Sequence, residues 1–81
     1  MTIKVIFYAV CRDLAGIESA TIGLPDNCTR ENFWAILLER YPDLQNISTR
    51  VALAVNNKYS KQDFNIKDSD VISLIPPVSG G

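Results

Sequence analysis

A single amphipathic helix with strand-like sequence on both sides is the feature that most constrains the fold of this chain. Residues 30–41 place apolar side chains along one helical face, Thr29 is a suitable N-cap, and Pro42 prevents the helix from continuing. Because one helix cannot enclose a core alone, this apolar face must pack on a sheet. The chain therefore predicts an α+β fold, a mixed sheet packed on one main helix. The apolar face consists of Phe33, Trp34, Ile36, Leu37, Leu38 and Tyr41.

About five strands are expected, from runs of β-branched and aromatic residues bounded by turn residues. The runs cover residues 3–10, 18–24, 50–55, 58–61 and 71–75. The first run is apolar almost throughout, which favours a central strand with neighbours on both sides. We expect the second strand to pair antiparallel with the first. A crossover through the helix would place the last strand parallel beside the first.

Alternation along the first strand assigns its side chains to two faces. One face carries Ile3, Val5, Phe7 and Ala9, and the other carries Lys4, Ile6, Tyr8 and Val10. Because the second set contains Lys4 and Tyr8, we expect it to face away from the helix. On the last strand, Ser73 is assigned to this outer face together with Val71 and Ile75.

The connecting segments carry residues that favour turns. Residues 12–16 can form one helical turn closed by Gly16, and Asn56-Asn57 can turn the chain into a hairpin. Residues 43–48 are expected to form a loop. Phe64 and Ile66 are expected to give the segment before the last strand a hydrophobic anchor.

Length and charge narrow the classes of protein to which the chain can belong. Its 81 residues are enough for one domain, which we assign to residues 1–75, followed by a C-terminal tail over residues 76–81. The net charge is −1 and there is no run of Lys or Arg, so the basic surface typical of nucleic-acid binding is absent. No apolar run is long enough to cross a bilayer and no signal peptide is recognisable, so we expect a cytoplasmic protein.

The chain lacks several residue types that catalytic centres commonly use. It contains no histidine, which excludes Ser–His and Cys–His nucleophile pairs as well as histidine-containing zinc sites. Cys11 and Cys28 are the only cysteines, and we expect free thiols packed in the core rather than a disulfide. An active site of its own is therefore not expected.

The tail, residues 76–81, reads Pro-Pro-Val-Ser-Gly-Gly. Pro76 and Pro77 cannot donate backbone hydrogen bonds, so the sheet should end before them, and each favours an extended conformation in the preceding residue. Six extended residues reach at most about 20 Å. Gly80 and Gly81 have no side chain, so they can enter a channel too narrow for a Cβ and present a carboxylate there. We interpret the tail as functional, with a carboxylate that needs activation, for example by adenylation, before acyl chemistry.

These features resemble the small, ubiquitin-like sulfur-carrier subunit of molybdopterin synthase (MoaD type), which has the β-grasp fold. The resemblance covers essentially the whole chain, and its most specific part is the terminal Pro-Pro-Val-Ser-Gly-Gly. Residues 4–9 and 12–16, Ala54-Val55-Asn56 and Asp68-Ser69-Asp70-Val71 also fit. At Ser69 the chain departs from the family, which usually has glycine there.

The resemblance implies a function for the end of the chain. An E1-like activating enzyme would use ATP and Mg²⁺ to adenylate the Gly81 carboxylate, and a sulfurtransferase or desulfurase would convert it to a thiocarboxylate. The tail would enter the large catalytic subunit of molybdopterin synthase, in a heterotetramer of two small and two large subunits. There the sulfur would pass to cyclic pyranopterin monophosphate, which becomes molybdopterin. No cofactor is expected to stay bound to this chain.

The resemblance also implies site residues. Gly81 would be the reacting group, and Gly80 would keep the tail slim. Tyr8, Tyr59 and Ile75 would form an exposed apolar patch for partner binding. The other tail residues would contact the partner: Pro76, Pro77, Val78 and Ser79.

Two other kinds of function remain open at this stage. The chain could carry sulfur for thiamine, cysteine or thiolated tRNA, or act as a ubiquitin-like modifier, although Ser79 stands where ubiquitin has Arg. It could also be a β-grasp interaction module with an inert tail. That last alternative predicts that loss of Gly80 and Gly81 leaves partner binding and cellular function intact.

Overall fold

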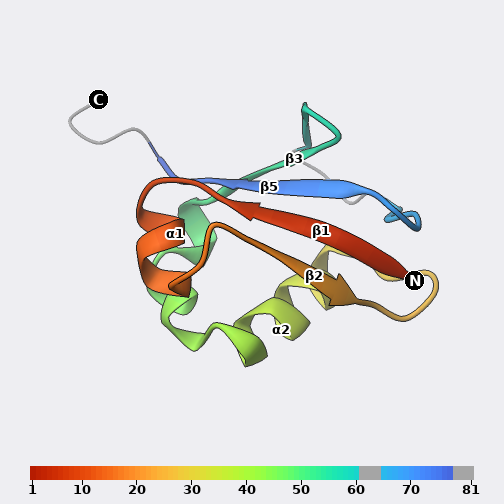
Figure 1. The fold of residues 1–81 in the computed structure, drawn as a ribbon, viewed down its shortest axis with the longest axis horizontal. Helices are drawn as coiled ribbons and strands as arrows, with labels where there is room; N and C mark the ends of the chain where they lie inside the picture. Colours follow the sequence, from red (N-terminus) through yellow and green to blue (C-terminus); the bar gives the residue numbers. More distant parts are fainter. Residues whose placement is uncertain (61–64, 78–81) are drawn as a thin grey trace.

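The computed structural model describes residues 1–60 and 65–77, and in this part of the chain a five-stranded sheet packs on one main helix (Figure 1). The strands are β1 (Thr2–Phe7), β2 (Ser19–Gly23), β3 (Ala52–Val55), β4 (Lys58–Ser60) and β5 (Val71–Ile75). The helices are α1 (Val10–Ala15) and α2 (Arg30–Arg40), with two short 3₁₀ helices, η1 (Pro42–Asn46) and η2 (Ser48–Arg50). The α+β architecture predicted from the sequence is confirmed.

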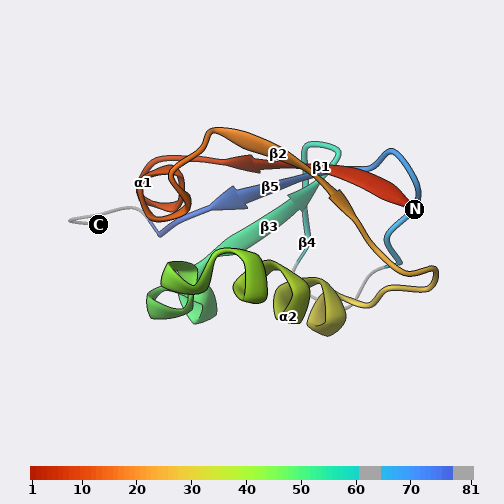
Figure 2. The same ribbon diagram turned by 60° about the horizontal axis from the view of Figure 1, so that its bottom comes forward.

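The strand order across the sheet is β2-β1-β5-β3-β4. β5 pairs parallel with β1 and antiparallel with β3, while β2 and β4 form the two edges in antiparallel pairs. The expected parallel pairing of the first and last strands is therefore confirmed. The chain leaves β5 at the end of the molecule where α1 lies, and the N-terminus lies at the opposite end (Figures 1 and 2).

Helix α2 covers one face of the sheet (Figure 2). The predicted N-cap is confirmed, because the Thr29 hydroxyl accepts a hydrogen bond of 3.1 Å from the Asn32 N–H. Phe33 and Leu37 are fully buried against the sheet, and each contributes about 1.5 to 3 kcal/mol by leaving water. The rest of the predicted stripe is partly buried against the same core: Trp34, Ile36, Leu38 and Tyr41. Tyr41 also packs edge-on against Phe7, with ring centroids 5.2 Å apart.

The predicted first strand is too long by three residues. β1 ends at Phe7, and Val10 already begins α1, whose last turn closes at Gly16 in the left-handed conformation, as expected. Ile3, Val5 and Phe7 are buried beneath the sheet, as predicted, whereas Ala9 is exposed and lies outside the strand. Alternation assumes that the strand continues, and it cannot detect a turn made of apolar residues.

Other boundaries also differ from the predicted ones. The expected loop over residues 43–48 lies in η1 and η2, because Pro42 suits the first position of a helical turn, and β3 starts only at Ala52. The Asn56-Asn57 turn is confirmed, since both residues have positive φ, 52° and 72°, as a type I′ hairpin requires. Ile66 is buried, as expected of an anchor. The predicted end of the hairpin at residue 61 and the anchor Phe64 lie outside the described residues.

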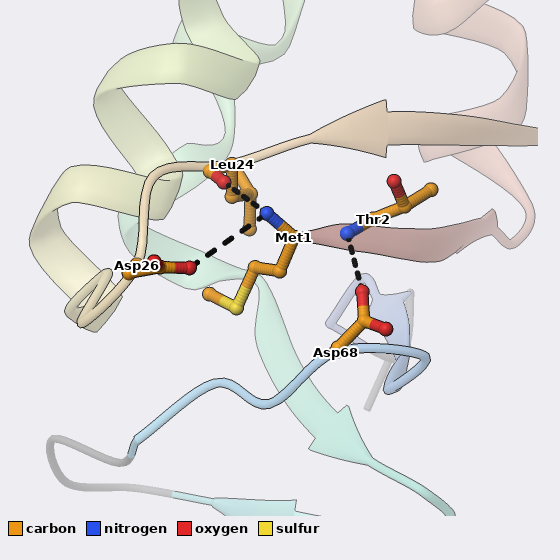
Figure 3. A network of polar contacts seen from close by, with 5 residues as sticks. All are labelled: Met1, Thr2, Leu24, Asp26 and Asp68. Carbon is orange, nitrogen blue, oxygen red and sulfur yellow. Dashed lines mark hydrogen bonds and ion pairs between the residues drawn. The ribbon is translucent and has the colours of Figure 1, made fainter.

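The segment that precedes β5 binds the beginning of β1 (Figure 3). The Thr2 N–H donates to the Asp68 carboxylate at 2.7 Å, and the Ser69 N–H donates to the Thr2 carbonyl at 2.8 Å. On the other side, the N-terminal ammonium donates to the Leu24 carbonyl at 2.9 Å and lies 3.9 Å from the Asp26 carboxylate. The first two residues are thus held from both sides.

Within the described residues, no helix has the length and apolar character needed to cross a membrane.

Replacing Ser69 by glycine is expected to stabilise the domain by about 0.5 to 1 kcal/mol. Ser69 has a φ of 70°, where a residue with a Cβ is strained by about 1 kcal/mol or more. Glycine removes this strain, but it loses more backbone entropy on folding, which offsets part of the stabilisation. The backbone hydrogen bond to Thr2 would remain. Chemical denaturation of Ser69→Gly and of the unsubstituted chain measures the difference, and a variant of lower stability would contradict the strained geometry.

Candidate docking site beside the C-terminal tail

A hollow of about 530 Å³ lies on the face of the sheet opposite the apolar core and α2, because Ala54 and Ser73 in its lining alternate with the core residues Leu53 and Leu74. We call it the open-face hollow. Its walls come from the turn after β1, from β3, β4 and the turn between them, and from β5 with the two prolines that follow it. Its lining residues are Tyr8, Ala9, Ala54, Asn57, Tyr59, Ser73, Ile75, Pro76 and Pro77.

Strand register explains why this face is hollow in its middle. Ser73 on β5 lies opposite Ala54 on β3, and Ala54 lies opposite Tyr59 on β4. Residues paired across strands share a face, so two small side chains form a floor beside a large one. Ser73 was correctly assigned to this outer face but is only 5 % exposed, because β1 and β3 flank its strand on both sides.

The predicted patch of Tyr8, Tyr59 and Ile75 is gathered around this one hollow. Tyr59 is 67 % exposed and Tyr8 47 % exposed, whereas Ile75 is half-buried. These tyrosines are among the few large apolar side chains exposed in the described residues, a feature typical of binding surfaces. Pro76 and Pro77 line the same hollow, so the tail begins at its rim. The other predicted tail residues, Val78, Ser79, Gly80 and Gly81, lie outside the described residues.

The open-face hollow is uncharged, since none of its lining residues carries a formal charge at neutral pH. A smaller hollow of about 280 Å³ adjoins it, sharing Tyr8 and including Lys4, Arg12 and Glu18. Arg12 and Glu18 form an exposed ion pair of 3.6 Å, an arrangement that contributes little to stability. An apolar centre beside a polar rim is the usual composition of a protein interface. This surface can therefore bind a partner.

Neither cysteine supplies reactive chemistry at this surface. Cys11 and Cys28 are free, buried thiols, as expected, and burial raises the pKa of both above the ordinary value of 9.0. A raised pKa keeps each thiol protonated and poorly nucleophilic at neutral pH. No group of three or more Cys, Asp or Glu residues that could hold a metal ion occurs in the described residues.

Four lining residues were not singled out from the sequence as site residues: Ala9, Ala54, Asn57 and Ser73. Small and polar side chains carry no binding signal by themselves. The alternation of β3 and β5 could have identified Ala54 and Ser73, once their strands were known to be neighbours. Nothing in the residue types alone points to Ala9 or Asn57.

One central strand that runs into a tail beside an exposed apolar hollow, on a five-stranded sheet with one covering helix, defines a ubiquitin-like β-grasp protein. The model of the ThiS family matches residues 5–81, and the chain belongs to this family. A relative from Chlamydomonas reinhardtii, named molybdopterin synthase sulfur carrier subunit, is 35 % identical, with the whole of each chain covered.

Two solved structures agree with this assignment. Subunits 1 and 2 of molybdopterin-converting factor from Helicobacter pylori were solved as a protein–protein complex. The matching chain in it has a TM-score of 0.74 and is 32 % identical, with the whole of both chains covered. SAMP1 from Haloferax volcanii has a TM-score of 0.88, again over the whole of both chains, but at 18 % identity it shows the fold alone.

Proposed function

We propose that this chain is the sulfur-carrier subunit of a molybdopterin synthase. The Chlamydomonas reinhardtii relative, which matches over its full length, carries this name, and the related Helicobacter pylori subunit was solved together with its second subunit. Both facts support a carrier that works bound to a larger catalytic subunit. The heterotetramer implied by the resemblance is part of the proposal.

The observation that best supports the proposal is the place where the tail begins. β5 is a central strand held between β1 and β3, and it continues into Pro76 and Pro77 at the rim of the open-face hollow. A partner that covers the hollow therefore also lies beside the start of the tail. Four further residues end at Gly81, and extended they reach about 13 Å. This supports docking through the hollow and delivery of the carboxylate into a partner's channel.

The proposed chemistry takes place at Gly81 in two stages. An E1-like partner, holding ATP and Mg²⁺, transfers AMP to the Gly81 carboxylate and releases pyrophosphate. The outer sulfur of a persulfide on a donor protein then attacks the carbonyl carbon, and AMP leaves. A thiol next attacks the inner sulfur of the resulting acyl persulfide, so that the S–S bond breaks, the thiol and the donor form a disulfide, and Gly81 is released as a thiocarboxylate. In the large subunit this sulfur attacks a carbon of cyclic pyranopterin monophosphate, and an oxygen substituent leaves that carbon as the C–S bond forms. Water then cleaves the bond between the sulfur and the Gly81 carbonyl, which restores the carboxylate and leaves the sulfur on the product.

The residues of this chain are consistent with catalysis by the partner proteins. It has no histidine, and the hollow presents no ionised group. In the proposed scheme the partners catalyse activation and transfer, while this chain contributes a docking surface and a narrow reactive end. Glycine at positions 80 and 81 suits that end, because each additional Cβ would widen the backbone.

The test is the intact mass of the chain after incubation with the activating enzyme, ATP and a sulfur donor. Conversion replaces one terminal oxygen by sulfur, and the mass increase must map to the C-terminal peptide. Oxidation of Met1 or a cysteine adds nearly the same mass but maps elsewhere, and a variant that lacks Gly81 controls for it. An unchanged C-terminal peptide, under conditions in which an established carrier is converted, would contradict the proposal.

Replacing Tyr8 by serine is expected to weaken binding of the large subunit about tenfold or more, without unfolding the domain. An exposed aromatic side chain beside a pocket is a typical interface anchor, and Tyr8 lies outside the buried core. Isothermal titration calorimetry measures the affinity. Ile17→Ser is the matched control, because Ile17 is similarly exposed (43 %) but does not line the open-face hollow. Equal effects of the two substitutions would remove Tyr8 from the interface.

A further inference from the structure

The chain turns sharply between β1 and α1, over residues 8–11. The Cys11 N–H donates to the Tyr8 carbonyl at 2.9 Å, which closes a four-residue β-turn. Ala9, the second residue of this turn, has φ 48° and ψ −123°. These angles are those of a type II′ turn, in which the second position is normally glycine.

An alanine at this position is strained. A residue with a Cβ in such a conformation costs of the order of 1 kcal/mol or more. Four of the other positive-φ residues in the described part of the chain are of types that tolerate positive φ better than alanine does: Gly16, Asn27, Asn56 and Asn57. The fifth, Ser69, has a polar side chain. Ala9 alone keeps a hydrophobic Cβ where glycine would fit without strain. Positions at which the residue type conflicts with the backbone conformation are mainly found at functional or strained sites.

Ala9 lies where the strain can act on the docking surface. It lines the open-face hollow together with its neighbour Tyr8 and with Pro76 and Pro77 at the start of the tail. On one side the turn follows β1, whose last residue, Phe7, is buried, and on the other side it is fixed by the fully buried Cys11. The Tyr8 N–H makes only a long bond of 3.4 Å to the Leu74 carbonyl, so the ladder holds Tyr8 weakly.

We propose that Ala9 is a positioning residue for partner binding, whose restricted backbone holds Tyr8 and the wall of the open-face hollow in the arrangement that the partner recognises. This role of the Ala9 backbone rests on the proposed function. Glycine at this position would relieve the strain but would let the turn adopt many conformations in the free protein. Binding would then require that freedom to be lost again, which weakens the affinity.

The test compares Ala9→Gly with Ser69→Gly, two substitutions that each remove one Cβ at a positive-φ residue. Ser69 is not among the residues that line the hollow. Both variants are expected to unfold at a higher temperature, by about 4 °C. Only Ala9→Gly is expected to bind the large subunit from the same organism more weakly, about three- to tenfold by titration calorimetry. Ala9→Ser, which keeps a Cβ, is expected to bind like the unsubstituted chain.

The outcomes separate this inference from the proposed function. Unsubstituted chain that does not bind the large subunit contradicts the proposed function. If the unsubstituted chain binds and Ala9→Gly binds equally well, the inference about Ala9 is wrong while the proposed function stands. If Ala9→Gly raises the melting temperature and weakens binding, the loss of affinity cannot come from a destabilised domain. A destabilised domain would show both a lower melting temperature and a lower affinity.

Discussion

A variant that lacks Gly80 and Gly81 is expected to lose sulfur transfer completely and to unfold at the same temperature as the full chain. The last buried residue of the described apolar core is Leu74, and glycine has no side chain that could be buried in a core. The reacting carboxylate, by contrast, would be displaced by two residues, about 7 Å of extended chain. Formation of molybdopterin from its precursor, with the activating enzyme, ATP, a sulfur donor and the large subunit present, measures the loss.

A second variant distinguishes the position of the carboxylate from the presence of the glycines. Adding one alanine after Gly81 keeps both glycines but moves the carboxylate and places a Cβ at the end. We expect this variant to bind the large subunit and to transfer no sulfur. Sulfur transfer by the variant that lacks Gly80 and Gly81 would show that the end of the tail is dispensable. Sulfur transfer by the alanine-extended variant would show that the position of the carboxylate is not critical.

Replacing Asp70 by alanine is expected to destabilise the domain by about 2 to 4 kcal/mol. Asp70 is 8 % exposed, and its carboxylate accepts hydrogen bonds from the Asn56 side-chain amide at 3.0 Å and from the Lys67 N–H at 2.8 Å. The Asn56 amide oxygen in turn accepts from the Val71 N–H at 2.9 Å. Losing the carboxylate would leave two donors without a partner and loosen the β3–β4 turn from the start of β5.

The size of this loss matters for a domain of 81 residues, whose total stability is of the order of 4 to 12 kcal/mol. Asp68→Ala is the matched control, since it removes a carboxylate from the same loop that makes one exposed hydrogen bond, to the Thr2 N–H. We expect it to cost only about 1 kcal/mol. Urea denaturation measures the free energy of unfolding of both variants. Equal losses of stability would mean that the buried hydrogen bonds of Asp70 stabilise the domain no more than the exposed one of Asp68.

Much of the fold could be predicted from the sequence because its signals are local. The stripe of α2, the cap at Thr29 and the Asn56-Asn57 turn each depend on residues a few positions apart. The end of β1 could not be predicted, because Tyr8, Ala9 and Val10 are as apolar as the strand before them. The turn there is imposed by the burial of Cys11 and by hydrogen bonds, neither of which appears in an alternation pattern.

In the candidate site, too, some residues could be predicted before the structure was known and others could not. Tyr8, Tyr59 and Ile75 came from the resemblance, and the structure places all three around one hollow. Its floor of Ala54 and Ser73 depends on which strands are neighbours, a property of the assembled sheet. The bond between Asn56 and Asp70 links two motifs that the sequence showed only as separate stretches, 14 positions apart.

The parallel pairing of β1 with β5 also determines how the domain responds to mechanical force. The two strands run in the same direction, and the start of β1 and the end of β5 lie at opposite ends of the molecule (Figure 1). A pull on the tail against the N-terminus therefore loads the hydrogen bonds between these strands in shear. Bonds loaded in this way must break together, whereas a hairpin pulled from its open end loses them one after another. If a partner draws the tail in and releases it, as the proposed function requires, the tail is attached to the domain through a strand that resists being pulled out.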